Sequence, residues 1–151
     1  MSHAADLYQE LILDHGRKPR NHRVLEGATA KADGHNPLCG DKATVYVAEK
    51  DGVVTGVSFV GNGCAISQAS TSLMTEAVKG KTLAEIETMY GHFHDLVTGV
   101  PPTEAEEEEL GKLAAFAGVS EFPMRVKCAT LAWHTLRAAL QGSTTPATTE
   151  F

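Results

Sequence analysis

Three cysteines and one aspartate have the types and neighbours that metal or sulfur chemistry requires. Cys39 and Asp41 are two residues apart, so in an extended segment both side chains point to the same side and could share one ion. Cys64 follows Gly61 and Gly63 and lies at the predicted start of a helix. The helix dipole lowers the pKa of a thiol at that position and favours the thiolate, the form that binds metal and attacks sulfur.

Cys128 allows two interpretations. It shares an apolar helical stripe with Leu131 and Thr135, which is typical of a cysteine packed in a core. Arg125 lies one turn earlier and Lys127 is adjacent, and their positive charges would favour a thiolate that acts as a ligand. From the residues alone, both interpretations stay open.

Three thiolates and one carboxylate could form a closed four-ligand zinc site, and similar donors hold iron–sulfur clusters. The cysteines are too far apart in the sequence for a Cys-x-x-Cys signature, so their spacing does not identify the metal. Among the seven histidines, His35 is four residues before Cys39 and is a candidate neighbour of the site. His92 and His94 could bind a metal as a pair, although we expect them in a surface loop.

The composition favours a single domain in a reducing compartment. The chain has 151 residues, which is enough for one domain with its own core. Its 19 acidic and 13 basic side chains give a net charge of -6, which is unfavourable for binding the phosphate backbone of a nucleic acid. We find no apolar run of the kind that forms a signal peptide or a membrane span, and therefore expect a cytoplasmic protein with reduced cysteines.

Secondary structure is predicted first for the half of the chain that precedes Cys64. The spacing of apolar residues over 4–15 predicts an amphipathic helix. Residues 43–49 alternate in polarity, and the β-branched residues of 53–60 follow the dipeptide Asp51-Gly52, which together predict a β-hairpin. A weaker strand is predicted near residues 28–32.

The second half of the chain has the pattern of helices. A helix is predicted from Cys64 to about Gly80. Thr82 and Thr103 are each followed three residues later by a glutamate, which is the pattern of a helix capping box. The last helix is predicted over residues 123–140.

These elements predict an α+β domain over residues 1–140, in which a small antiparallel three-stranded sheet packs against helices. Residues 141–151 are rich in Ser, Thr and Pro and have little apolar surface to bury, so we expect a disordered tail.

Three segments resemble the IscU/SufU family of iron–sulfur cluster assembly proteins. They are Asn36 to Asp41, Gly61 to Met74 and Arg125 to Trp133, and the resemblance extends up to about Leu140. It implies the fold of this family and of the NifU N-terminal domain. Carried over residue by residue, it also implies that the metal ligands are Cys39, Asp41, Cys64 and Cys128.

Lys127 indicates which branch of the family the chain resembles. The scaffold branch has a histidine just before the third cysteine, where this chain has Lys127. That branch also carries a Leu-Pro-Pro-Val-Lys segment recognised by a chaperone, where residues 122–127 read Phe-Pro-Met-Arg-Val-Lys. Both differences, together with a longer stretch between the second and third cysteines, resemble the SufU branch.

The resemblance implies a zinc-dependent sulfurtransferase that works with a SufS-type cysteine desulfurase. Persulfide sulfur would pass to Cys39 while Zn²⁺ stays on the remaining ligands, and Arg125 could steady the free thiolate or persulfide. The sulfur would then go to a downstream scaffold or to apo acceptor proteins. Two alternatives remain: a scaffold on which iron and sulfide form a [2Fe-2S] cluster, and a structural zinc domain.

Overall fold

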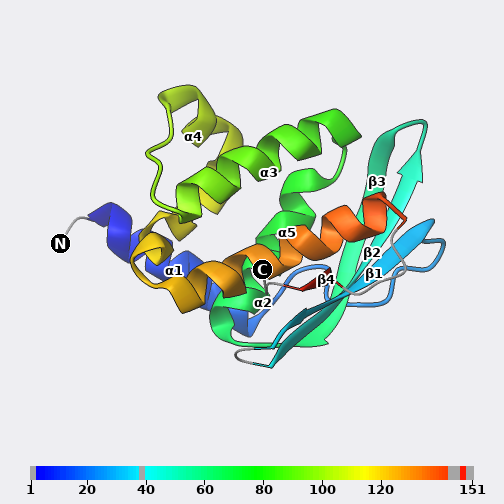
Figure 1. Ribbon diagram of the computed structural model, residues 1–151, viewed down its shortest axis with the longest axis horizontal. Coiled ribbons are helices and arrows are strands. Elements are labelled where there is room, and N and C mark those ends of the chain that lie inside the picture. Colours follow the sequence, from blue (N-terminus) through cyan, green and yellow to red (C-terminus); the bar gives the residue numbers. More distant parts are fainter. Residues whose placement is uncertain (1–2, 38–39, 143–146, 149–151) are drawn as a thin grey trace.

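The first helix is followed by three consecutive strands, then by the other helices and a short last strand, which is an α+β arrangement (Figure 1). The structure is a computed structural model that describes residues 3–37, 40–142 and 147–148, with the backbone alone for residues 3–8 and 147–148. The elements are α1 (His3–Arg17), β1 (Ala30–Asn36), β2 (Asp41–Lys50), β3 (Val53–Asn62), α2 (Ala65–Val78), α3 (Leu83–Val97), α4 (Glu104–Leu110), the 3-10 helix η1 (Gly111–Glu121), α5 (Pro123–Leu140) and β4 (Ala147–Thr148).

The predicted hairpin is confirmed and forms strands β2 and β3. Strands β2 and β3 are antiparallel, and the turn between them contains Asp51 and Gly52, whose φ angles are 55° and 79°. Positive φ at both central residues is what a tight two-residue hairpin turn requires. Strand β1 pairs antiparallel with the other side of β2 and completes the predicted three-stranded antiparallel sheet.

Two parts of the sheet differ from the expectation. The weak strand expected near residues 28–32 lies at Ala30–Asn36, because pairing with β2 extends it through polar residues with little intrinsic preference for a strand. Ala147–Thr148, in the tail expected to be disordered, forms β4 and pairs in parallel with Gly34 and His35. The strand order is therefore β3-β2-β1-β4. Residues 143–146 and 149–151 of that tail lie outside the described residues.

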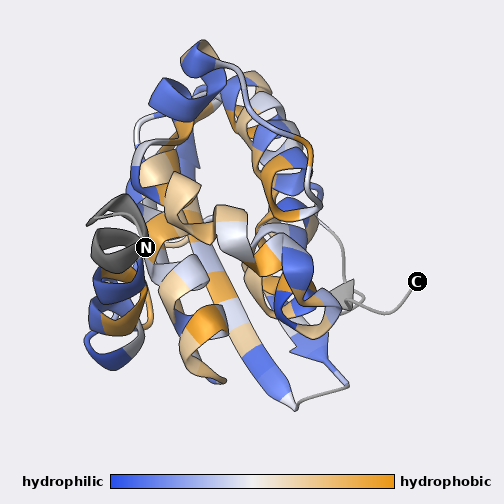
Figure 2. Ribbon diagram, turned by 90° about the vertical axis from the view of Figure 1, so that its left-hand side faces the viewer, coloured by the Kyte–Doolittle hydropathy of each residue, from blue (hydrophilic) through white to orange (hydrophobic). Residues whose placement is uncertain are grey.

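Helices α2 and α5 pack against the sheet, while α1 packs on α2 and α3 packs on η1 and α5. The core between them is aromatic at its centre, where the Phe93 ring stacks on Trp133 at 5.4 Å and meets Phe116 edge-on at 5.9 Å. In Figure 2 the hydrophobic residues gather where helices face one another and the sheet. In the part of the chain that the structure describes, no helix is long and apolar enough to cross a membrane.

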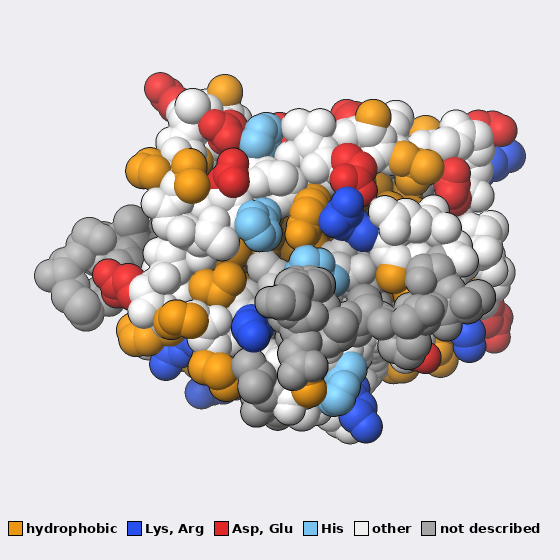
Figure 3. Space-filling model, viewed as in Figure 1, with side chains coloured by type: hydrophobic (Ala, Val, Ile, Leu, Met, Phe, Trp, Pro, Cys, Tyr) orange, Lys and Arg blue, Asp and Glu red, His pale blue; other side chains and the backbone are white. Residues whose placement is uncertain are grey.

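The expectation of a surface loop for His92 and His94 is wrong. Both histidines lie in α3, because Met89 and Phe93 continue the buried face of that helix through the Gly/His/Phe stretch. The capping boxes at Thr82 and Thr103 are present and begin α3 and α4. Figure 3 shows acidic side chains gathered over α4, a helix with an exposed glutamate run.

Candidate metal centre

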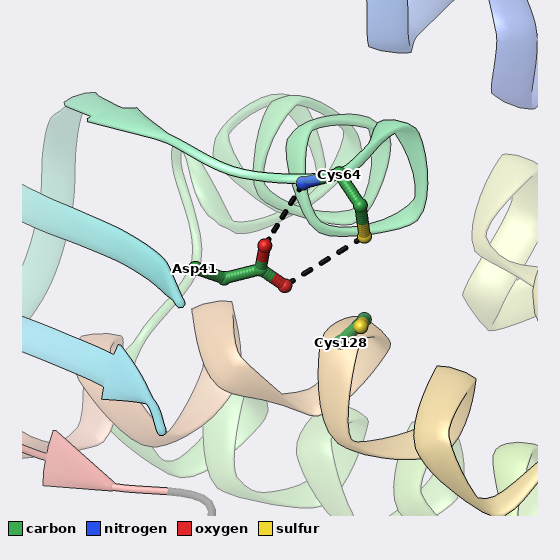
Figure 4. Close-up of side chains that lie close together, drawn as sticks. All are labelled: Asp41, Cys64 and Cys128. Atoms are coloured by element: carbon green, nitrogen blue, oxygen red, sulfur yellow. Dashed lines mark hydrogen bonds between the residues drawn. The ribbon is translucent and has the colours of Figure 1, made fainter. Parts of the chain in front are cut away.

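Asp41, Cys64 and Cys128 come together at one end of the sheet. Each of them offers one ligand atom, and these three atoms lie within 4.8 Å of one another. Figure 4 shows the three side chains converging from β2, from the N-terminus of α2 and from α5. The group is thus built from three separate elements, and it depends on how β2, α2 and α5 pack together.

Asp41 is the first residue of β2 and is only 2% exposed. One carboxylate oxygen, Oδ1, accepts a hydrogen bond from the backbone N–H of Cys64 at 2.9 Å. The other, Oδ2, accepts a hydrogen bond from the thiol of Cys64 at 3.6 Å. Gly63 allows this close approach, because a Cβ there would lie 3.1 Å from Oδ1 of Asp41.

Cys64 is the N-cap of α2, as its position after the glycines predicts. Its sulfur accepts a hydrogen bond from the backbone N–H of Ser67 at 3.4 Å, which is the role usually taken by Ser, Thr, Asp or Asn. Hydrogen bonding, first from Cys128 and then from the Ser67 N–H, lowers the pKa of the Cys64 thiol to about 7, against the opposing effects of burial and Asp41. The lowered pKa favours the thiolate, the form that binds a metal ion.

Gly61 brings the end of β3 close to β2 just before this cap. Its φ is 150°, and a Cβ at this position would collide with the carbonyl oxygen of Lys42. Only glycine fits there, so the segment that leads into Cys64 lies directly beside the start of β2.

Cys128 fits both interpretations that the sequence left open. It is buried, with 6% of its surface exposed, in the first half of α5. Its sulfur also belongs to the three-atom group, and the side-chain amide of Asn36 donates a hydrogen bond to it at 3.8 Å. Cys128 is thus both packed in the core and placed with its sulfur among the candidate ligand atoms.

This donor set suits a thiophilic metal ion. Cysteine sulfur and aspartate oxygen are both donors that bind zinc, which most often takes four ligands in a tetrahedral arrangement. Exposed Cys64 leaves one side of the group open to solvent, while Asp41 and Cys128 are buried. Of the described residues, these three could hold the ion.

The other predicted site residues lie in different places. Cys39 lies outside the described residues, two positions before Asp41. His35 is not a member of the group. It is next to the inward-facing Asn36 on β1, so its side chain points to the opposite face of the sheet. His92 instead faces α4, with its Nδ1 2.9 Å from Glu109 and its Nε2 3.5 Å from Glu106.

Arg125 is exposed in the first turn of α5, and its guanidinium lies 4.4 Å from the centroid of the Phe122 ring. Together with Cys64 it lines an open, mainly apolar pocket of about 670 Å³ between α1, the start of α2 and η1. The pocket thus connects the exposed thiol with a positive charge on the same surface.

The sequence gives no chemical reason to single out Asn36, which the structure shows to be fully buried beside the group. The available signal is that Asn36 begins the segment Asn36 to Asp41, one of those that carry the family resemblance. In the structure Asn36 is paired with Asp41, and paired residues on adjacent strands point to the same face of a sheet.

The chain matches the family described as the NifU-like N terminal domain over residues 7–141. It is 40% identical over 130 residues to the zinc-dependent sulfurtransferase SufU of Bacillus subtilis, with 86% of each chain covered. It is 39% identical over 137 residues to the iron–sulfur cluster assembly scaffold protein IscU of Streptococcus pyogenes, covering 91% of this chain and 84% of the relative.

A solved structure has the same fold. The crystal structure of a putative iron–sulfur cluster assembly scaffold protein for the SUF system, from Fervidobacterium islandicum, superposes with a TM-score of 0.81 at 38% identity. The match covers 93% of this chain and 99% of that one.

Proposed function

We propose that this chain, which belongs to the NifU-like N-terminal domain family, acts in iron–sulfur cluster assembly as a zinc-dependent sulfurtransferase. In this proposal Cys39 accepts persulfide sulfur from a SufS-type cysteine desulfurase in the cytoplasm, and the sulfur then passes to a scaffold or to apo acceptor proteins. The proposal is supported by the relative from Bacillus subtilis, which is 40% identical and is named a zinc-dependent sulfurtransferase.

The observation that supports the proposal most directly is the convergence of Asp41, Cys64 and Cys128 within 4.8 Å. We assign these three residues, with Cys39, as the ligands of Zn²⁺. Bound zinc would keep its cysteines deprotonated at neutral pH. Asp41 also accepts a hydrogen bond from the backbone N–H of Cys64, so the carboxylate orders the start of α2.

Cys39 is the sulfur acceptor in this proposal. Its thiolate attacks the outer sulfur of the partner's cysteine persulfide, so a new S–S bond forms on Cys39 and the partner's S–S bond breaks. The electron pair leaves with the partner's cysteine, which becomes a thiolate. The exchange conserves charge and oxidation state and needs no further oxidant or reductant.

Cys64 and Cys128 are less suited to this exchange. Cys64 caps α2 through its sulfur, and Cys128 is buried in α5, so moving either sulfur to a partner would disturb a helix. Cys39 is followed by Gly40, whose φ of 74° is a conformation that glycine adopts without strain. Arg125 contributes a positive charge at the pocket it shares with Cys64, where it can pair with the thiolate or persulfide of Cys39.

Mass spectrometry tests the proposal. The zinc-loaded protein is incubated with a SufS-type desulfurase and free cysteine, alkylated and digested, and the additional sulfur is located on the peptides. We expect it on the peptide that contains Cys39 and expect its loss in Cys39→Ser. Sulfur found mainly on Cys64 or Cys128, with Cys39 unmodified, would contradict the proposal.

A second candidate is a scaffold on which a [2Fe-2S] cluster is assembled and transferred. The names of the relatives from Streptococcus pyogenes and Fervidobacterium islandicum support it, and the same donors could hold a cluster. Metal analysis of freshly purified protein separates the two candidates. One zinc ion and a colourless solution favour the sulfurtransferase, whereas iron, sulfide and a brown solution favour the scaffold.

A further inference from the structure

Asn36 connects three parts of the candidate metal centre. Its side-chain amide donates a hydrogen bond to the sulfur of Cys128 at 3.8 Å, a length within the range for a sulfur acceptor. Its backbone carbonyl accepts a hydrogen bond from the N–H of Gly40 at 2.9 Å. Its Cα is paired with that of Asp41 in the β1–β2 ladder. One residue therefore contacts a sulfur of the group and Gly40, the residue that follows Cys39 in the sequence.

Close packing of β1 on α5 brings Asn36 to Cys128. Gly34 lies two residues before Asn36, on the same buried face of β1, and a Cβ at Gly34 would overlap the hydroxyl oxygen of Thr135. Thr135 is two helical turns after Cys128 along α5. Because the glycine lets the strand backbone lie against the helix, the short side chain of Asn36 reaches the buried sulfur.

Burial makes this hydrogen bond more important than its length suggests. Asn36 is 0% exposed and Cys128 is 6% exposed, so water has little access to replace the contact. An N–H that points at a sulfur stabilises negative charge on it and restricts the directions in which its remaining lone pairs can bind. Residues that orient a metal ligand in this way affect metal affinity without touching the metal.

We propose that Asn36 is a positioning residue that holds the Cys128 sulfur in the donor set. The inference rests on the proposed function, since it assigns Asn36 the task of keeping Cys128 in place while Cys39 exchanges sulfur with a partner. Asn36 has no role as a ligand or a nucleophile. It acts through the Cys128 sulfur and through the hydrogen bond to Gly40.

Cobalt substitution tests this role without the desulfurase. The metal-free protein and its Asn36→Leu variant, which removes the donor at similar volume, are loaded with Co²⁺ and their sulfur-to-cobalt charge-transfer bands are compared. Removing an N–H from the sulfur raises the energy of its lone pairs, so we expect the band to move to longer wavelength in Asn36→Leu. In a competition assay we expect zinc affinity to fall by roughly 10- to 100-fold.

The matched control is Asn62→Leu. Asn62 is exposed at the same end of the sheet. It lies on the outer strand β3 and is paired with Lys42 of β2. We expect the cobalt band and the zinc affinity of Asn62→Leu to equal those of the parent. If Asn36→Leu does not fold, Asn36→Asp serves in its place, because an ionised carboxylate has the shape of the amide but cannot donate to the sulfur.

A folded Asn36 variant with the parent's cobalt band and zinc affinity would overturn the role of Asn36. A failure of the proposed function would be distinguishable from a failure of this inference. If sulfur did not reach Cys39 in the parent protein, the sulfurtransferase would be rejected while the cobalt and zinc measurements would still report on Asn36. A merely structural role for Asn36 predicts lower unfolding stability of the metal-free variant with an unshifted band, which also overturns the proposal.

Discussion

Asp41 holds Cys64 through both oxygens of its carboxylate, one on the backbone N–H at 2.9 Å and the other on the thiol at 3.6 Å. The carboxylate thus lies at the N-terminus of α2, where negative charge is favourable. The two residues come from different elements, 23 positions apart in the chain. Their contact gives Asp41 a structural role besides the role as a ligand that we propose.

The structural role predicts how metal-free variants of Asp41 unfold. Asp41→Ala leaves the Cys64 N–H without its acceptor, so we expect the free energy of unfolding to fall by about 1–3 kcal/mol. Asp41→Asn keeps a carbonyl oxygen in the same position and should lose less. Urea denaturation of the metal-free proteins measures both changes. Equal losses for the two variants would show that the charge, and not the hydrogen bond, matters at this position.

The proposed roles predict a different order for sulfur acceptance. Cys39→Ser removes the nucleophile, whereas Asp41→Ala removes a harder and weaker zinc ligand that does not react with sulfur. We expect Cys39→Ser to lose nearly all stimulation of the desulfurase, and Asp41→Ala to lose zinc affinity while retaining part of the stimulation. The reverse order would mean that the two roles are wrongly assigned.

Removal of metal should lower the stability of the fold. An ion that binds only the native protein adds about 4 kcal/mol when its free concentration is 1,000 times Kd. For a chain of this size that corresponds to a Tm higher by roughly 8–16 °C. Calorimetry before and after chelation, followed by addition of zinc, measures the effect. An unchanged Tm in protein shown to be metal-free would argue against a metal bound across β2, α2 and α5.

Local patterns were enough to predict the elements whose signals are contained within a few residues. Asp51-Gly52 fixes the hairpin, and Thr82 and Thr103 fix the starts of two helices, because each of these signals acts on the backbone nearby. Cys64 was expected at a helix start for the same reason, and its sulfur caps α2. The predicted grouping of Asp41, Cys64 and Cys128 came from the family resemblance, since nothing local indicates which strands and helices meet.

Features that depend on packing were missed. Strand β1 continues through Gly34, His35 and Asn36 because β2 and α5 hold it, although these residue types do not favour strands. The contact between Asn36 and Cys128 joins positions 92 apart, beyond the reach of any periodicity. His92 was assigned to a loop because its neighbours include glycine, but a buried Phe93 keeps that segment helical.

The packing of β1 on α5 predicts the effect of an added methyl group at Gly34. Gly34→Ala places a Cβ against Thr135, so we expect the free energy of unfolding to fall by about 1–3 kcal/mol or more. Gly91→Ala is the matched control, because the position is helical, exposed and open around its missing Cβ. That variant should gain up to about 1 kcal/mol, since alanine favours a helix. Equal effects of the two changes in urea denaturation would contradict the close strand–helix contact.

His134 predicts how the stability of the protein depends on pH. Burial in α5, with further effects from Arg137 and His94, lowers the pKa of His134 to about 4 from its ordinary value of 6.5. Between pH 6.5 and pH 4 the unfolded chain therefore binds more protons at this residue than the folded chain does. Stability must fall as pH falls through this window and level off below it. After allowing for partial exposure, we expect a loss on the order of 2 kcal/mol from His134 alone.

His134→Gln should remove this part of the acid sensitivity, so that its curve of unfolding free energy against pH is flatter than that of the parent between pH 6.5 and 4. His92→Gln is the contrasting variant, because hydrogen bonding to Glu109 raises the pKa of His92. The stabilising contribution of His92 is fully present below pH 6.5 and is lost as pH rises through its raised pKa. His92→Gln should therefore leave the slope between pH 6.5 and 4 as in the parent, and should lack the gain in stability that the parent shows when pH falls toward 6.5 from above. Urea denaturation at a series of pH values compares the three proteins. If the unfolding free energies of His134→Gln and the parent changed in parallel with pH throughout, His134 would not be held neutral by burial.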